Sequence, residues 1–233
     1  IAEGLEKLRS RVLIFCYQLS HIRSGKSHIQ KSLSVWKPEL ERYAGLVQQI
    51  KEKSKELKSL VAEKKGLPIY HVKRHKVMTV RIAELTEDLE ELRSEKALLL
   101  QKFEYAEDAG AEAFRKDIAT MEAGLKKLET QEQKYSVELD KALAEYVELK
   151  AQASELDPVE LYAARQTVRP AQEKAAEKQL EEILQRKPTL SLLLNAKQET
   201  SRLLKEDTEE RQARQMVIRR QRSDPQKPKH FQR

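Results

Sequence analysis

Hydrophobic residues between Ile82 and Leu156 recur at alternating steps of three and four positions, which is the spacing of a coiled-coil seam. Glu, Lys, Arg and Gln fill the flanking positions, as a solvated helical surface requires. Only Lys96 and Glu132 interrupt the seam at positions where a hydrophobic side chain is expected. The pattern therefore predicts long helices that each bury one stripe of side chains.

The seam does not keep a single register, because the equivalent positions Ala106 and Phe114 are eight residues apart instead of seven. Residues 107–110 lie between them, and Gly110 can close a helix in the left-handed conformation without a steric penalty. We interpret this stretch as an antiparallel helical hairpin hinged near Gly110. The alternative is one continuous rod that absorbs the extra residue by local rewinding.

The segment before the seam contains two further helices by the same pattern. Three heptads between Leu5 and Ile22 predict a first helix that ends near Gly25. A second helix is expected to begin at Pro38, because the residue before a proline is disfavoured in a helix. Gly66 and Pro68 are expected to end it.

After Leu156 the sequence predicts shorter helices. Asp157 is followed by a proline and, at the third position, by a carboxylate, which together specify a helix start. Pro170 is expected to restart or kink this helix, which then runs to Lys187. Thr189 can cap another helix, whose hydrophobic stripe extends to Leu204.

The expected fold class is all-α, with elongated coiled-coil helices. We divide the chain into N-terminal helices (1–66), a central coiled-coil hairpin (67–156), C-terminal helices (157–222) and a disordered basic tail (223–233). A hairpin that folds on itself and a dimer of rods satisfy the same heptads, so the oligomeric state stays open.

Composition supports this organisation. Only 5% of the residues are aromatic and 36% are charged, which is typical of long helices. The longest hydrophobic run, Val12–Tyr17, is much shorter than the roughly 20 residues that span a bilayer. The single cysteine, Cys16, lies in that run and has no cysteine to pair with, so we expect a core residue and a reducing, cytoplasmic location.

The charge is unevenly distributed. Residues 211–233 contain eight basic side chains and one acidic side chain, and residues 51–76 contain nine and three, whereas residues 77–210 contain 20 and 30. Basic clusters can neutralise phosphates without reading sequence, although a basic end can also be a solubilising tail. The candidate DNA contacts are Lys51, Lys53, Lys55, Lys58, Lys64, Lys65, Arg214, Arg219, Arg220 and Arg222.

Sites for catalysis are not evident in the sequence. His71 and His75 have the spacing of a metal-binding helix, but Val72 stands where the catalytic glutamate of that motif would be, and no third ligand is nearby. The sequence contains no glycine-rich phosphate loop, and no base accompanies the tyrosines. We therefore expect no enzymatic activity, metal, cofactor or small-molecule substrate.

Several segments carry a family resemblance: residues 81–96 (RIAELTEDLEELRSEK), 117–122 (DIATME), 126–128 (KKL), 157–165 (DPVELYAAR), 168–170 (VRP) and 201–204 (SRLL). They resemble the C-terminal helical region of bacterial MobA/MobL-type plasmid mobilisation relaxases. The similarity covers roughly residues 40–210. The segments around Asp157 and Pro170 are the more discriminating ones, since they lie outside the heptad repeat.

In such relaxases, the resemblance implies, an N-terminal domain nicks DNA with a tyrosine nucleophile and a metal held by histidines. This chain lacks that cluster, so no catalytic residue is carried over. The resemblance implies a non-catalytic tail that associates with partner helices, its own or those of mobilisation proteins, and helps to hold DNA during conjugation. The alternative function is a self-associating structural coiled coil with no nucleic-acid role.

Overall fold

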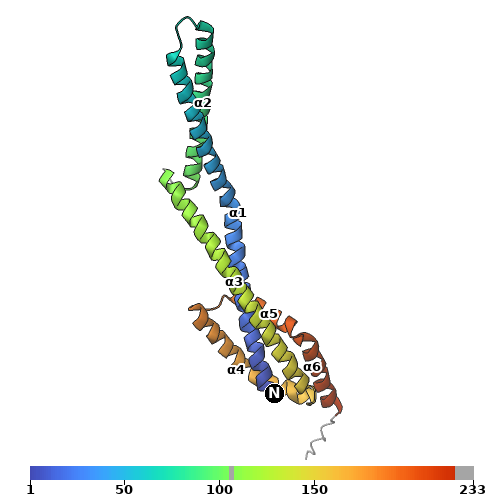
Figure 1. Cartoon of the computed structure of the whole chain (residues 1–233). Coiled ribbons are helices and arrows are strands. Elements are labelled where there is room, and N and C mark those ends of the chain that lie inside the picture. Colours follow the sequence, from blue (N-terminus) through green and yellow to red (C-terminus); the bar gives the residue numbers. More distant parts are fainter. Residues whose placement is uncertain (105–107, 224–233) are drawn as a thin grey trace, which may run out of the picture. The chain divides into compact units, whose positions relative to one another are not determined.

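The structure is a computed structural model that describes residues 1–104 and 108–223. Within these ranges the chain forms α-helices and no strands, which confirms the all-α prediction. The helices are α1 (Ala2–Gly66), α2 (Val72–Lys102), α3 (Asp108–Ala153), α4 (Pro158–Leu184), α5 (Leu190–Leu203) and α6 (Glu206–Ser223) (Figure 1). The tail expected to be disordered lies, from residue 224 onward, outside the described residues.

Helix α1 is a single helix where the sequence predicted two. It passes through Gly25 and Pro38 without a break and ends at Gly66, as expected. A proline inside a helix removes one backbone hydrogen bond and costs about 3 kcal/mol. Packing of Trp36 and Tyr43, on either side of Pro38, offsets that cost, which explains why the local signal did not end the helix.

The chain divides into two compact units, which are described separately. Unit 1 contains residues 1–26 and the described residues from 127 onward, and unit 2 contains the described residues of 27–126. Each of the helices α1 and α3 has one segment in unit 1 and another segment in unit 2.

Unit 1 has a core that is wider than a coiled-coil stripe. Residues Val12, Leu13, Ile14, Cys16 and Tyr17 are all buried, so α1 is covered on most of its circumference. A helix that is hydrophobic all round must be surrounded by other helices. The covering side chains come from α3, α4 and α5, with Leu204 beyond the end of α5, and they include Ala142, Tyr146, Ala176, Leu180, Leu193 and Ala196.

The turns of unit 1 confirm some sequence signals and correct others. The Asp157 side chain accepts a hydrogen bond from the Val159 amide at 2.8 Å, which confirms the predicted start of α4. Helix α4 continues through Pro170 but ends at Leu184, before the expected Lys187, because Gln185 adopts a left-handed conformation with φ of 53°. A second left-handed residue, Lys205 with φ of 55°, separates α5 from α6, a break that the sequence did not predict.

Helices α1 and α3 run antiparallel in unit 1. Arg11 pairs with Glu145 at 2.8 Å and Arg23 pairs with Glu132 at 2.9 Å, so residue numbers rise on one helix as they fall on the other. Glu132, the charged residue in the predicted seam, also accepts a hydrogen bond from Lys26. These two hydrogen bonds lower the pKa of the Glu132 carboxyl, which explains how a carboxylate is tolerated there.

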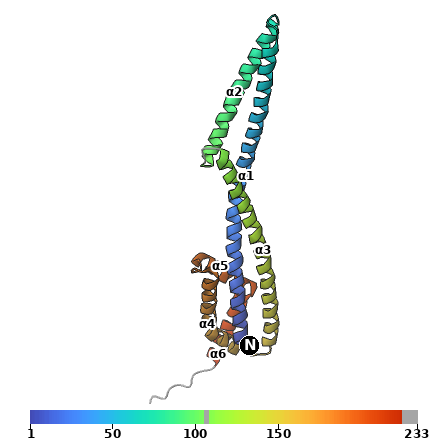
Figure 2. The same ribbon diagram turned by 60° about the vertical axis from the view of Figure 1, so that its left-hand side comes forward.

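Unit 2 is organised around a hairpin of α1 and α2. The two helices lie side by side in both views of the chain (Figures 1 and 2). Glu56 pairs with Arg81 at 3.1 Å and Glu63 pairs with Arg74 at 2.6 Å, which sets the antiparallel register. The turn between the helices lies at residues 67–71, immediately after Gly66.

The predicted hairpin hinged near Gly110 is therefore wrong in its pairing. Gly110 lies inside α3, and α2 ends at Lys102. Residues 105–107, which include the first residue of the expected hinge, lie outside the described residues. In unit 2 the start of α3 also runs antiparallel to α1, with Ala111 near Tyr43 and Glu122 paired to Lys37 at 3.0 Å. In unit 2, α2 and the start of α3 therefore both pack on α1. They can do so because α1 continues through Pro38 and exposes one long row of hydrophobic side chains to them.

An aromatic cluster joins the three helix segments of unit 2. The rings of Phe103 and Phe114 stack with centroids 4.5 Å apart, and Trp36 contacts Phe114 edge-on at 5.5 Å. Tyr43 contacts Phe103 at 6.2 Å. The cluster fixes the point where α2 ends and α3 begins, since its members come from α1, from α3 and from the residue after α2.

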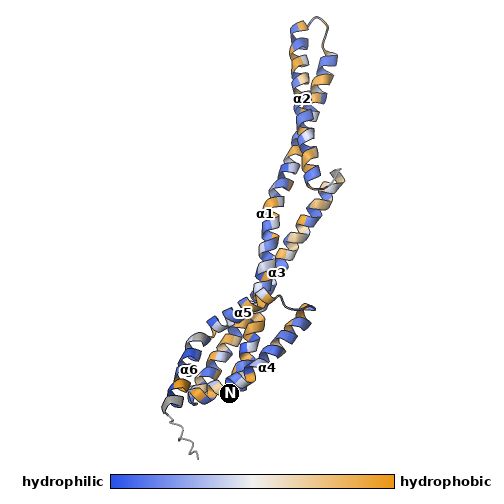
Figure 3. Cartoon of the chain, turned by 180° about the vertical axis from the view of Figure 1, so that it is seen from behind, coloured by the Kyte–Doolittle hydropathy of each residue, from blue (hydrophilic) through white to orange (hydrophobic). Residues whose placement is uncertain are grey.

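Hydrophobic and hydrophilic residues are mixed along each labelled helix (Figure 3). Among the described residues, none of the helices combines the length and the hydrophobicity needed to cross a bilayer.

Candidate nucleic-acid interface

A stripe of lysines follows one face of the second half of α1. Lys51, Lys55, Lys58 and Lys65 are separated by four, three and seven residues, so they fall within one narrow sector of the helix. All four side chains are exposed. We call these four residues the lysine stripe. It flanks the side of α1 that packs on α2.

The acidic side chains nearest to the lysine stripe are engaged elsewhere. Glu56 and Glu63 pair with Arg81 and Arg74 of α2, and Glu52 accepts a hydrogen bond from Gln48 at 2.7 Å. Within the described part of the chain, the lysines of the stripe make no ion pair of their own. Their charges are therefore available to an external anion.

The two remaining lysine candidates of this helix lie apart from the stripe. Lys53 faces α2 and forms an ion pair with Asp88. Lys64 is half-buried and lies close to the helical phase of Lys53, eleven residues earlier. Sequence reasoning grouped all six lysines, and the helical phase separates four of them from these two.

The tip of the hairpin adds exposed hydrophobic side chains and further positive charge. Ile69 is 92% exposed and Tyr70 is 79% exposed. No acidic residue occurs between Glu63 and Glu84, whereas this stretch contains six lysine and arginine residues. His75 is half-buried and its Nε2 atom has no hydrogen-bond partner.

The arginine candidates of α6 lie in unit 1, where the described contacts of Arg214 and Arg220 are made to side chains of the same unit. The side chain of Arg222 lies outside the described residues. Arg220 donates to Asp157 at 2.8 Å, and Arg214 donates to the Tyr162 hydroxyl at 3.3 Å. Arg214 also lies 3.9 Å from Glu210, four residues earlier on the same helix. These contacts attach α6 to α4, so at least part of the predicted basic cluster has a structural role.

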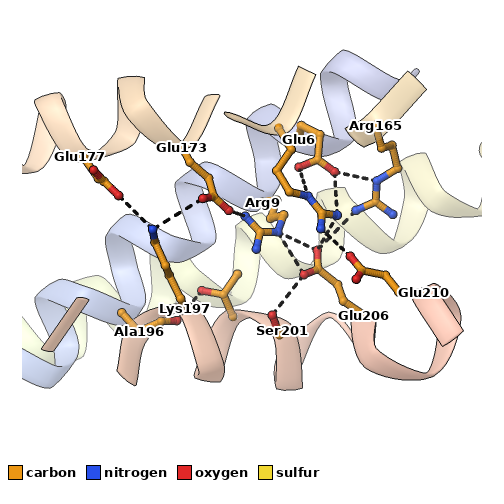
Figure 4. Close-up of polar contacts among 12 residues, drawn as sticks. Glu6, Arg9, Arg165, Glu173, Glu177, Ala196, Lys197, Ser201, Glu206 and Glu210 are labelled. Carbon is orange, nitrogen blue, oxygen red and sulfur yellow. Dashed lines mark hydrogen bonds and ion pairs between the residues drawn. The ribbon is translucent and has the colours of Figure 1, made fainter. Parts of the chain in front are cut away.

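Unit 1 contains a buried network of charges that sequence reasoning missed (Figure 4). Arg9 donates from Nε to both oxygens of Glu206, at 2.8 and 3.0 Å. Arg165 and Arg169 donate to opposite oxygens of Glu6, at 2.7 and 3.0 Å. The side chains of Glu6 and Glu206 are only 1% and 3% exposed.

The network connects α1, α4 and α6. Arg169 also donates to Glu210, and Arg9 donates to Glu173 at 2.6 Å. Burial acts to lower the pKa of Arg169, but its carboxylate partners outweigh burial and raise that pKa, so the guanidinium stays charged. Buried charges are tolerated when they are paired and hydrogen-bonded in this way.

A sequence signal for this network exists in retrospect. Arg165 and Arg169 are four residues apart on α4, and Glu206 and Glu210 are four residues apart on α6, so each pair presents two like charges on one helical face. The positive pair on α4 and the negative pair on α6 are complementary and so favour a contact, but the two helices are distant in sequence. Only the fold shows that the two faces meet.

A cleft of about 230 Å³ lies beside the network, between α4 and α6. Leu161, Ala213 and Met216 provide hydrophobic walls, and Arg165 and Glu206 lie at its polar side. Arg165 also donates to the Tyr146 hydroxyl at 3.1 Å. Because these polar groups are already paired with each other, the cleft presents no uncompensated charge to a ligand.

Cys16 behaves as the core residue that the sequence predicted. It is buried, and burial raises the pKa of its thiol to about 11. Among the described residues, no group of three or more histidine, cysteine, aspartate or glutamate side chains is placed to hold a metal ion.

The geometry defines an all-helical protein that exposes a lysine stripe on a helical hairpin in unit 2 and buries a charge network in unit 1. Comparison with protein-family models, with curated proteins and with solved structures gives no match.

Proposed function

We propose that this chain is a non-catalytic helical protein region that holds the phosphate backbone of DNA through the lysine stripe of α1. The observation that supports the proposal is the alignment of Lys51, Lys55, Lys58 and Lys65 on one exposed face, with the neighbouring carboxylates engaged elsewhere. Lysine contacts to phosphates give affinity without sequence specificity.

The dimensions of the stripe suit a nucleic-acid backbone. Its ends are 14 residues apart, which corresponds to about 21 Å of helix. Each phosphate that is neutralised on duplex DNA contributes about −0.9 to the slope of log affinity against log salt concentration. Four contacts would therefore give a slope of about −3 to −4.

The test is a salt titration of binding to a fluorescent DNA duplex, measured by anisotropy. The stripe variant carries Gln at Lys51, Lys55, Lys58 and Lys65. The matched control carries Gln at four exposed lysines outside the stripe: Lys116, Lys127, Lys134 and Lys178. Both variants lose the same net charge, so a difference between them reports the arrangement of the lysines.

We expect the stripe variant to lose at least tenfold in affinity and most of the salt slope, while the control stays within threefold of the wild type. A companion variant, Arg214→Gln with Arg219→Gln, is expected to have a smaller effect, because Arg214 is engaged with Tyr162. If the wild type does not bind even at low salt, the DNA role fails and the self-associating structural coiled coil is the better explanation.

The finer proposal is that this DNA contact serves plasmid mobilisation, as a non-catalytic region of a relaxase system. Its support is the sequence resemblance at residues 81–96, 157–165 and 168–170. The test is a conjugative transfer assay in which a mobilisation protein carries this region with either the stripe variant or the control variant. A transfer frequency that is equal for the two variants would contradict the proposal.

A further inference from the structure

The outward face of α2 exposes hydrophobic side chains that no described element covers. Val77 is 69% exposed and Val80 is 58% exposed, and Ala83 is also exposed. They lie on the side of α2 opposite to Leu85 and Leu89, which are buried. This face, which we call the outer face of α2, extends from Val72 to Glu91.

Charge along the outer face changes sign from one end to the other. Lys73 and Lys76 lie before the valines, and Glu87 and Glu91 lie after them. All four side chains are exposed, and within the described residues none of them forms an ion pair. A positive end, a central part with the exposed valines and a negative end therefore follow one another over about 27 Å of helix. Glu84 also lies on the central part, where it pairs with Arg81 of the same helix at 3.4 Å.

We propose that the outer face of α2 binds the same face of a second copy of this chain in antiparallel orientation. The order of the charges along this face favours a second copy of the chain as the partner, and it favours the antiparallel direction. In an antiparallel pair the positive end of each copy meets the negative end of the other, whereas a parallel pair would oppose like charges. A face that is complementary to itself under a two-fold rotation is what an isologous dimer requires.

The register follows from the positions of the charges. Placing Lys73 opposite Glu91 and Lys76 opposite Glu87 centres the two-fold axis near residue 82. Val80 and Ala83 of both copies then meet around the axis. Val80 and Ala83 form the hydrophobic part of the central contact, with Glu84 beside them, and two ion pairs flank it at each end, the arrangement found in antiparallel helix pairs with charged flanks.

This interface is separate from the proposed DNA contact. The lysine stripe lies on α1, and none of its four lysines takes part in the outer face of α2. Dimerisation would bring two lysine stripes into one particle, but it does not depend on DNA binding. Each proposal can fail without the other.

The test is sedimentation velocity of the full chain over a range of protein concentrations, with two charge-reversal variants. The first variant is Lys73→Glu with Lys76→Glu, and the second is Glu87→Lys with Glu91→Lys. Each variant alone opposes like charges at both ends of the interface. In an equal mixture, one chain of each kind restores opposite charges at both ends.

We expect the wild type to approach twice its 27.1 kDa mass as concentration rises. Each variant alone should dimerise at least tenfold more weakly, and the mixture should recover the wild-type affinity. The control, Lys127→Glu with Lys134→Glu on α3, should dimerise as the wild type does. Val80→Glu, at an exposed position, should abolish the dimer, and circular dichroism should show that its helix content equals that of the wild type.

Three results would overturn the proposal: a wild type that stays monomeric at every concentration, a dimer that both variants retain, or a mixture that associates no better than the variants alone. The mixture tests whether these four charges face one another across the interface; it does not depend on their exact register.

Discussion

Removing one carboxylate from the buried network should destabilise unit 1 selectively. Glu206→Gln keeps the size of the side chain but removes the charge that Arg9 contacts at 2.8 and 3.0 Å and that Arg165 contacts at 3.4 Å. Ser201 also donates to this carboxylate. The substitution leaves the buried Arg9 and the part-buried Arg165 and Arg169 facing fewer negative charges than they have in the wild type.

The magnitude follows from the burial of the pair. Losing a hydrogen bond to a charged partner costs about 1.5–3 kcal/mol, and breaking a buried ion pair from one side costs about 3–5 kcal/mol. The side chains of Arg9 and Glu206 are 6% and 3% exposed, so solvent screening is small and the upper range applies. We expect a loss of about 3–5 kcal/mol in the free energy of unfolding.

The two units offer separate probes for the assay. Trp36, the only tryptophan, reports unit 2 by fluorescence, and Cys16, the only cysteine, reports unit 1 by its reaction with a thiol reagent. Burial and a thiol pKa of about 11 should make labelling of native Cys16 slow at pH 8. Labelling as a function of urea concentration therefore follows the opening of unit 1.

With a urea dependence of about 2–3 kcal/mol/M, the labelling midpoint of Glu206→Gln should fall by about 1–2 M. The Trp36 transition should move by much less. The control, Glu182→Gln at an exposed position of α4, should stay within about 0.5 kcal/mol of the wild type. A midpoint for Glu206→Gln equal to that of the control would refute the stabilising role of the network.

Three further substitutions test separate parts of the fold. Pro38→Ala should stabilise unit 2 by about 2–3 kcal/mol in urea unfolding followed by Trp36 fluorescence, because it restores a backbone hydrogen bond within α1; no change would mean that the helix is interrupted there. Phe103→Ala should cost about 3–5 kcal/mol by the same measurement, and Phe103→Leu clearly less, because the ring is buried in the aromatic cluster. Asp157→Asn keeps the helix cap but loses the ion pair with Arg220. In the wild type, the hydrogen bonds from Arg220 and from the Val159 amide lower the pKa of the Asp157 carboxyl. A lowered folded-state pKa adds stability above the ordinary aspartate pKa of about 4, so the advantage of the wild type over Asp157→Asn in thermal unfolding should be present at pH 7 and vanish as the pH falls through the lowered value.

The sequence by itself determined the helical class and some of the helix ends. Heptad spacing predicted long helices because a period close to 3.6 residues is a local property of the chain. Gly66 and Asp157 ended and started helices where expected, since their preferences act on the backbone within a few residues. Cys16, inside the hydrophobic run Val12–Tyr17, was expected to be a core residue, and it lies in the core of unit 1.

Only the tertiary structure decided which hydrophobic stripes meet. Equivalent heptads can pair in several ways, and α1 becomes the common partner of α2 and α3 because packing around Trp36 carries the helix through Pro38. The charge network was hidden for the same reason, because Glu6 lies more than 150 residues from Arg165 in the chain. Local propensity specifies the helices, whereas contacts between distant segments specify their arrangement, and the energy of those contacts exceeds the cost of one misplaced proline.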